Sequence, residues 1–167
     1  TDLPDPIPPL GPWELDMDDH YAYLIGKPDG TIAPASNITR EEVSAIFFRL
    51  LSEKTRGELL SREARFPDVS PDHWSNTAVS TLSGAGILRG QPDGTFAPGR
   101  NITRAEFAVI ASRFATTVIV LQSKFADTAG HWAEAEINRA AMLGWIAGHP
   151  DGTFAPDAYV PPAEVAN

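Results

Sequence analysis

A motif of four residues that occurs three times constrains this chain more than any other feature. Pro-Asp-Gly-Thr begins at Pro28, Pro92 and Pro150, and each copy continues through Ile or Phe into Ala-Pro. Three copies at near-equal spacing are typical of chains that stack similar units, each of which buries its apolar face against its neighbours. We therefore expect an array of three related units.

Two further motifs recur in step with the first. Asn-Ile-Thr-Arg begins at Asn37 and Asn101, and a divergent copy covers residues 159–164. A Phe-x-Asp segment that leads to His-Trp begins at Phe66 and at Phe125. The motifs keep the same order wherever they occur together, which indicates one structural plan for each unit.

Apolar residues between the motifs follow the period of a helix. The positions i, i+4, i+7, i+8 and i+11 after the second His-Trp are taken by Ala133, Ile137, Ala140, Ala141 and Gly144. Residues 78–85 keep part of the same stripe. Gly86 and Gly144 stand where a glycine commonly ends a helix. These patterns predict a mostly α fold in which each unit consists of a helix, a short turn, the Pro-Asp-Gly loop and a second helix.

The second helix of each unit has a well-defined predicted start. Thr39 and Thr103 each precede a glutamate by three residues, which is the spacing of a capping box. Apolar pairs suited to a hydrophobic staple are Ile38 with Val43 and Ile102 with Phe107. Helices are therefore predicted to begin directly after both threonines.

Arg40 and Arg104, which follow these threonines, allow two interpretations. A cation beside the positive end of a helix dipole costs about 0.3–1 kcal/mol, so each arginine needs a compensating role. One role is anion capture, in which free backbone N–H groups and the guanidinium converge on a carboxylate. The other is a structural salt bridge to a neighbouring acid such as Asp68 or Asp127. The residues alone do not decide between the two roles.

Acidic segments offer two candidate cation sites, and a structural interpretation is favoured for both. Each Pro-Asp-Gly-Thr turn has one aspartate, far short of the oxygen ligands that calcium needs. Such an aspartate more often bonds its own backbone while the glycine takes a positive φ. The second candidate comprises Asp16, Asp18, Asp19 and His20. It is expected to be a solvated charged stretch, and no metal site is predicted.

Trp74 and Trp132 follow the two histidines and also allow two interpretations. Either ring could stack on a sugar, or it could fill the core between helices. The core is favoured, because a large aromatic side chain beside an apolar stripe has much area to bury.

Composition and charge narrow the classes of function. The chain of 167 residues has a net charge of -9, no cysteine and a sequence pI of about 4.8. Its field repels nucleic acid and anionic membranes, so an anionic ligand must be held by a local cluster of cations. No apolar run suits a membrane span, and the absence of a signal-peptide pattern suggests a mature piece of a larger protein. No catalytic or nucleotide-binding motif is present, so we expect neither enzyme activity nor a cofactor.

Taken together, the motifs resemble S-layer homology repeats. Residues 66–107 carry the full pattern, from Phe-x-Asp through His-Trp and Gly-x-Pro-Asp-Gly-Thr-Phe to Ile-Thr-Arg-Ala-Glu-Phe. Residues 125–164 match it except at Pro161 and Pro162, and the first unit matches only over residues 26–43. The density of proline near the start predicts a linker at 1–14. The resemblance predicts repeats at 15–65, 66–122 and 123–167, of which the first and third are incomplete.

The resemblance also implies a place and a ligand. Members of this family form a pseudo-threefold bundle at the bacterial cell surface or in an S-layer. Grooves between their units bind secondary cell wall polysaccharide, often through a sugar that carries a pyruvate ketal. On this basis the ligand-binding residues are expected to be Arg40, Arg104, Gly90, Gly148, Asp68, Asp127, Trp74 and Trp132. We expect Arg104 to be partly exposed and to face such a groove.

The function expected from the resemblance is non-covalent anchoring of a surface protein to this anionic polysaccharide. The alternative is a structural subunit of an extracellular sheet or filament, assembled through contacts between repeats. Pro161-Pro162 replaces the Thr-Arg pair in the third unit, so that groove is expected to bind no ligand.

The incomplete ends of the array raise a question of packing. The helix after Thr39 presents an apolar stripe made of Val43, Ile46, Phe47, Leu50 and Leu51. The first unit lacks the leading helix that would cover this stripe. Residues beyond Asn167, the neighbouring units or a second subunit could cover it, and of these we expect a C-terminal extension first and a second subunit next.

Overall fold

The computed structural model describes residues 37–114 and 124–165, and it confirms the mostly α fold class. The helices are α1 (Arg40–Leu50), α2 (Glu53–Leu59), α3 (Asn76–Gly84), α4 (Arg104–Ser112), α5 (Glu134–Met142) and α6 (Pro162–Val165). The linker at 1–14, the acidic stretch at 16–20 and the first Pro-Asp-Gly turn lie outside the described residues. None of the described helices has the length and apolar character needed to cross a membrane.

Three chain segments meet in a closed ring of backbone hydrogen bonds at the centre of the fold. The N–H of Ile38 donates to Val160 O (3.0 Å), that of Val160 to Ile102 O (3.2 Å), and that of Ile102 to Ile38 O (3.0 Å). All three side chains are buried. Each residue stands directly before a helix-start motif, so the ring gives the recurring motifs a threefold arrangement in space.

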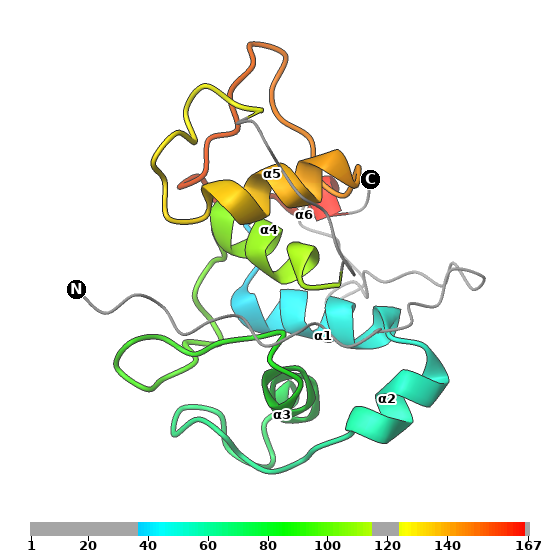
Figure 1. The fold of residues 1–167 in the computed structure, drawn as a ribbon. Helices are drawn as coiled ribbons and strands as arrows, with labels where there is room; N and C mark the ends of the chain where they lie inside the picture. The colour runs from blue at the N-terminus through cyan, green and yellow to red at the C-terminus, as the bar shows by residue number, and fades with distance from the viewer. Residues whose placement is uncertain (1–36, 115–123, 166–167) are drawn as a thin grey trace.

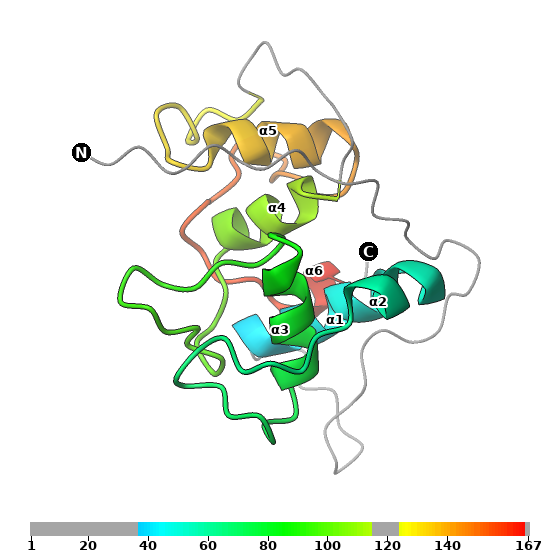
Figure 2. The same ribbon diagram turned by 60° about the horizontal axis from the view of Figure 1, so that its bottom comes forward.

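The helices stack around this ring, as Figures 1 and 2 show from two directions: α4 lies between α5 and α1, and α3 packs on the other side of α1. The ring of Phe47 on α1 lies 5.4 Å from that of Phe107 and 5.1 Å from that of Phe114. Phe47 and Leu51 are buried, and Leu50 packs partly buried against the same core. The α1 stripe is thus covered within the chain, so the expectation that an extension or a second subunit covers it is wrong.

The predicted helix starts and ends are confirmed. Thr39 and Thr103 are the N-caps of α1 and α4, and both form complete capping boxes with Glu42 and Glu106. α6 begins at Pro162, which is tolerated because the first turn of a helix needs no N–H there. Positive φ values of 75° follow α3 at Gly86 and α5 at Gly144. Sequence motifs missed only α2, which begins after an N-cap at Ser52.

In both described Pro-Asp-Gly-Thr turns the aspartate side chain accepts hydrogen bonds from within the turn, as the structural interpretation predicts. Asp93 Oδ1 accepts hydrogen bonds from the backbone N–H (2.9 Å) and hydroxyl (2.7 Å) of Thr95. Asp151 does the same with Thr153 at 3.0 and 2.7 Å. Gly94 and Gly152 follow with φ of 83° and 84°, a conformation that suits glycine. The side-chain and then the backbone bonds from these threonines lower the pKa of both aspartates.

This geometry predicts a loss of stability in acid. Since the folded pKa of Asp93 and Asp151 lies below the ordinary value of 3.8, the folded state binds fewer protons than the unfolded chain. Their contribution is therefore complete above that value and is lost as the pH falls through the lower folded pKa. We expect the urea midpoint of unfolding to drop below about pH 4, and less steeply in the double variant Asp93→Asn with Asp151→Asn. An identical slope in the two proteins would contradict this assignment.

Candidate functional site

The candidate site lies where the start of one helix meets the preceding motifs of the next unit. We call the contact of α1 with residues 66–106 the first junction, and the contact of α4 with residues 125–164 the second junction. At the first, the N–H of Arg40 donates to Arg100 O (2.9 Å) and that of Glu41 to Pro98 O (3.1 Å). Their counterparts at the second donate to Ala158 O (2.8 Å) and Pro156 O (2.9 Å). Because these N–H groups donate hydrogen bonds to carbonyls of the next unit, the expectation that they are free to bind an anion is wrong.

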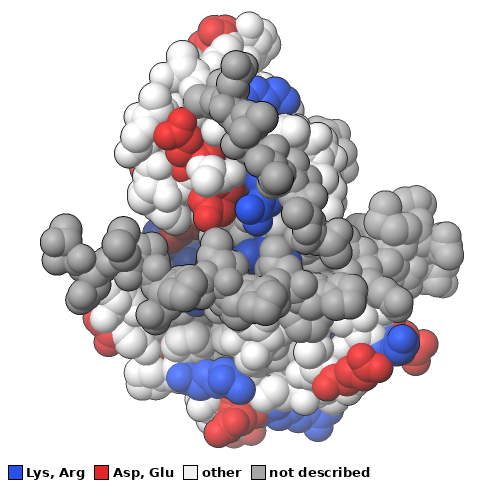
Figure 3. Space-filling view, in the orientation of Figure 1, with Lys and Arg blue, Asp and Glu red and all other residues white. Residues whose placement is uncertain are grey.

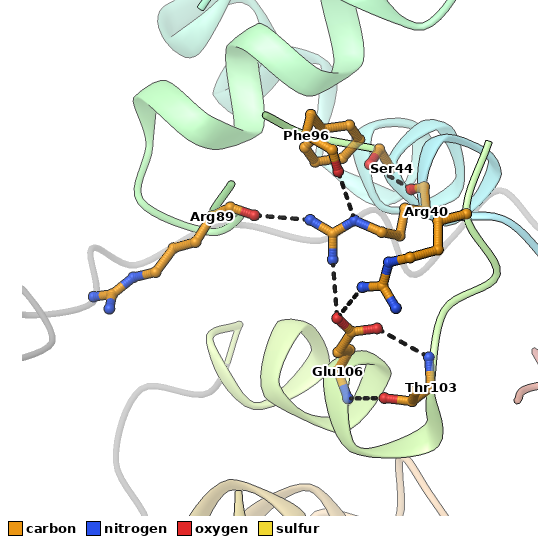
Figure 4. Close-up of polar contacts among 7 residues, drawn as sticks. Arg40, Ser44, Arg89, Phe96, Thr103 and Glu106 are labelled. Atoms are coloured by element: carbon orange, nitrogen blue, oxygen red, sulfur yellow. Dashed lines mark hydrogen bonds and ion pairs between the residues drawn. The ribbon is translucent and has the colours of Figure 1, made fainter. Parts of the chain in front are cut away.

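The guanidinium of Arg40 lies inside the first junction. Its Nε donates to Phe96 O (2.9 Å), its Nη2 to Arg89 O (2.9 Å), and its Nη1 to the Glu106 carboxylate (3.3 Å) (Figure 4). The group also lies 4.6 Å from the centroid of the Phe96 ring. These acceptors hold the guanidinium away from the start of its own helix. The cation therefore does not lie at the positive end of the helix dipole.

Arg104 repeats this arrangement at the second junction. Its Nε donates to Phe154 O (2.6 Å), its Nη2 donates to Ala147 O (2.9 Å), and its Nη1 forms an ion pair with Glu164. Arg104 is at a helix start as predicted, but it is only 4% exposed. The expected partial exposure is therefore wrong. Burial lowers the pKa of both arginines, and each guanidinium holds two units together.

The arginines form salt bridges, as one of the two interpretations expects, but with Glu106 and Glu164 rather than with Asp68 and Asp127. Asp68 accepts the N–H groups of Phe96 (2.8 Å) and Ala97 (2.6 Å). Asp127 accepts the equivalent groups of Phe154 (2.8 Å) and Ala155 (2.7 Å). Successive N–H groups of this kind form a concave anion site, which here is filled by the chain's own carboxylate.

These two acceptors also stabilise unusual backbone. Ala97 and Ala155 have φ of 55° and 54°, where a side chain costs energy that the surrounding contacts must offset. Burial opposes the charge of Asp127, yet the two backbone bonds outweigh it and its pKa is lowered. The aspartates thus fix the conformation of the loops whose carbonyls accept hydrogen bonds from the arginines.

Gly90 and Gly148 are needed where an aromatic ring touches the main chain. A Cβ at Gly90 would lie 2.5 Å from Phe66 Cε1 and 2.8 Å from Thr95 O. At Gly148 it would lie 2.2 Å from Phe125 Cε1 and 2.7 Å from Thr153 O. The structure therefore gives both glycines a packing role.

Trp74 and Trp132 lie at the surface, so the preferred core interpretation is wrong. They are 59% and 66% exposed, respectively. Each is preceded by a histidine whose Nδ1 accepts a backbone N–H at the start of α3 or α5, from Ser75 (3.4 Å) or Ala133 (3.2 Å). The imidazole thereby fixes the segment that presents the indole. Each junction carries one outward-facing tryptophan.

Sequence reasoning missed the partners of the arginines. The sequence identifies Glu106 as a helix cap, and it is one, because its Oε2 accepts the N–H of Thr103 (3.0 Å). Its Oε1 is the atom that Arg40 contacts from the neighbouring unit. The sequence does contain a signal for this pairing. Arg and Glu recur two residues apart at both helix starts, so the arginine of one unit can pair with the glutamate of the next. Within the described residues, no group of three or more acidic or histidine side chains is placed to hold a metal.

The repetition of one arrangement at both junctions agrees with the comparison to known families. The profile of the S-layer homology domain matches residues 21–44, 65–108 and 124–161. The chain belongs to the S-layer homology family. As a member it is an extracellular module of the bacterial cell surface.

Relatives of this S-layer homology module are much longer proteins. It is 39% identical over 159 residues to Cell surface glycoprotein 1 and 34% identical over 152 residues to the Cellulosome-anchoring protein, both of Acetivibrio thermocellus. It is 30% identical over 168 residues to an S-layer protein of Bacillus licheniformis. These alignments cover 87%, 87% and 96% of the chain but 7%, 34% and 19% of the relatives. The chain therefore corresponds to a small part of each relative.

Proposed function

We propose that the module holds a larger surface protein on the cell wall by binding a secondary wall polysaccharide non-covalently at its junctions. The observation that carries the proposal is the pair of exposed tryptophans at equivalent places. Leaving an indole in water forfeits a large apolar contribution to folding, so two such rings in matching positions favour a ligand. The names of the relatives, which include an anchoring protein and a cell surface glycoprotein, support the same role.

The residues divide between contact and support. Trp74 and Trp132 would stack on sugar rings, and the ligand would be an anionic polymer, such as one with pyruvate ketals. Arg40, Arg104, Asp68, Asp127, Gly90 and Gly148 would act by fixing the loops beside the tryptophans. The proposed repeats at 15–65, 66–122 and 123–167 place one of these rings in each of the second and third.

The way in which the junction carboxylates are used supports a role without catalysis. Asp68 and Asp127 are bound by backbone N–H groups, and Glu106 and Glu164 by arginines. A hydrolase of glycans needs two carboxyl groups that face a bond of the substrate. These four are instead committed to structure, which supports a binding module.

Tryptophan substitutions test the proposal. Trp74→Ala and Trp132→Ala should each weaken binding to purified wall polysaccharide about tenfold, because each removes one stacking surface. Stability should change little, since both rings are exposed. Isothermal titration would give the affinities. Trp145→Ala, beyond the opposite end of α5, is the matched control, and equal losses from all three variants would contradict the placement of the site.

A further inference from the structure

The two junctions differ in charge, although they share one plan. At the first, Glu106 Oε1 is contacted by Nη1 of Arg40 and also by Nη2 of Arg100. Two guanidinium groups therefore share one carboxylate. At the second junction, the contacts pair Arg104 with Glu164 alone. The first junction thus holds a cation that its nearest carboxylate does not neutralise.

Resting on the proposed function, we propose that Arg100 contacts the carboxylate of the ligand, which makes the first junction the anion-selective site of the two. Its side chain is 37% exposed, whereas that of Arg40 is 7% exposed. A ligand can therefore reach Arg100 and not Arg40. The side chain of Arg89 points away from this cluster in Figure 4, so it does not compete for the role.

The hydrogen bonds of Arg100 leave capacity for a ligand. Within the described residues, its guanidinium bonds only Glu106, through Nη2, so that Nη1 is left to donate to a ligand, whereas the unpaired Nε is itself buried. A carboxylate is the natural partner of such a fork, because it can accept two parallel N–H bonds. It would also reduce the repulsion between adjacent guanidiniums, which adds to burial in lowering the pKa of Arg40.

The second junction lacks each of these features. The carbonyl of Ala158 occupies the place of the Arg100 carbonyl, since it accepts the N–H of Arg104 as the other accepts that of Arg40. The position that supplies the spare cation is therefore an alanine. Asp157 adds an 88% exposed carboxylate 3.5 Å from His131. The extra acid of the first junction, Glu41, is instead held by the Ser75 hydroxyl at 3.1 Å and lies 3.6 Å from His73.

Figure 3 is consistent with a local rather than a broad source of attraction for an anion. On the face that it shows, acidic and basic side chains are interspersed. With a net charge of -9, the protein as a whole repels an anion, so discrimination must come from single well-placed cations. Arg100 meets that requirement and Ala158 does not.

The test compares two glycosides and five proteins by isothermal titration. The probes are a methyl hexoside that carries a pyruvate ketal and the same glycoside without the ketal. Arg100→Ala and Arg100→Gln should each weaken binding of the charged probe about tenfold, the effect of losing a charge-assisted hydrogen bond. Binding of the neutral probe should hardly change. Lys54→Ala, which removes one exposed positive charge on α2, is the control for net charge.

A gain of binding completes the test and does not depend on a destabilised variant. Ala158→Arg should raise the affinity of the second junction for the charged probe, seen as a second site of similar strength. Equal affinity of wild type and both Arg100 variants for the charged probe would overturn the assignment while leaving the proposed function intact. Failure of the wild type to bind either probe would instead count against the proposed function and this inference together.

Discussion

Replacing Arg104 by Ala is expected to lower the free energy of unfolding by about 3–6 kcal/mol, because it removes two hydrogen bonds from a charged donor, each worth about 1.5–3 kcal/mol. The variant would leave the carbonyls of Phe154 and Ala147 without their donor. It would also remove the cation that lies 4.4 Å from the centroid of the Phe154 ring. Urea unfolding followed by circular dichroism would measure the change.

The control for this substitution is Arg62→Ala, because Arg62 is exposed and its truncation should change stability by less than about 0.5 kcal/mol. If Arg104→Ala matched the control in stability but lost binding to wall polysaccharide, holding the two units together would not be the main role of Arg104. Direct contact with the ligand would then be the better account.

Alanine at Gly90 or Gly148 should also destabilise the fold, by about 1–3 kcal/mol or more, because overpacking a well-filled region forces its neighbours to move. Each new Cβ would lie within 3 Å of a backbone carbonyl oxygen as well as of a phenylalanine ring. The ring could rotate away, whereas the carbonyl belongs to the Pro-Asp-Gly-Thr turn. Thermal unfolding would report the loss.

Gly99→Ala is the matched control for the glycine variants. Its Cβ would have no atom within 4 Å, and its φ lies outside the positive range. A stabilisation of about 0.4–1 kcal/mol is expected there, since alanine restricts the unfolded chain. Similar losses at Gly90 and Gly99 would mean that the close approach of Phe66 is not what requires glycine.

Local signals explain what the sequence could predict of the fold. The capping boxes after Thr39 and Thr103 and the helix ends at Gly86 and Gly144 depend on neighbouring residues, and all were predicted. The recurrence of motifs also predicted three equivalent segments. The backbone ring through Ile38, Ile102 and Val160 was not itself predictable, because no side-chain pattern marks which carbonyl each N–H will meet.

The failures concern burial, which depends on contacts between distant segments. The acceptors of the Arg40 guanidinium on the next unit include Phe96 O, 56 residues away. An arginine at a helix start gives no local sign that it will be enclosed. Size alone places Trp74 in the core, yet it is exposed, and the largest fully buried side chains are instead Phe96 and Phe154. The α1 stripe is likewise covered by distant residues, Phe107 on α4 and Phe114 just after it.

Binding to bacterial wall sacculi tests the anchoring role most directly. The module would be incubated with sacculi that retain their secondary polysaccharide and with sacculi stripped of it, then sedimented and quantified. Anchoring through the polysaccharide predicts that the protein sediments with the first and stays in solution with the second. Equal sedimentation with both, or sheets and filaments formed by the module alone without binding to either, would contradict the account.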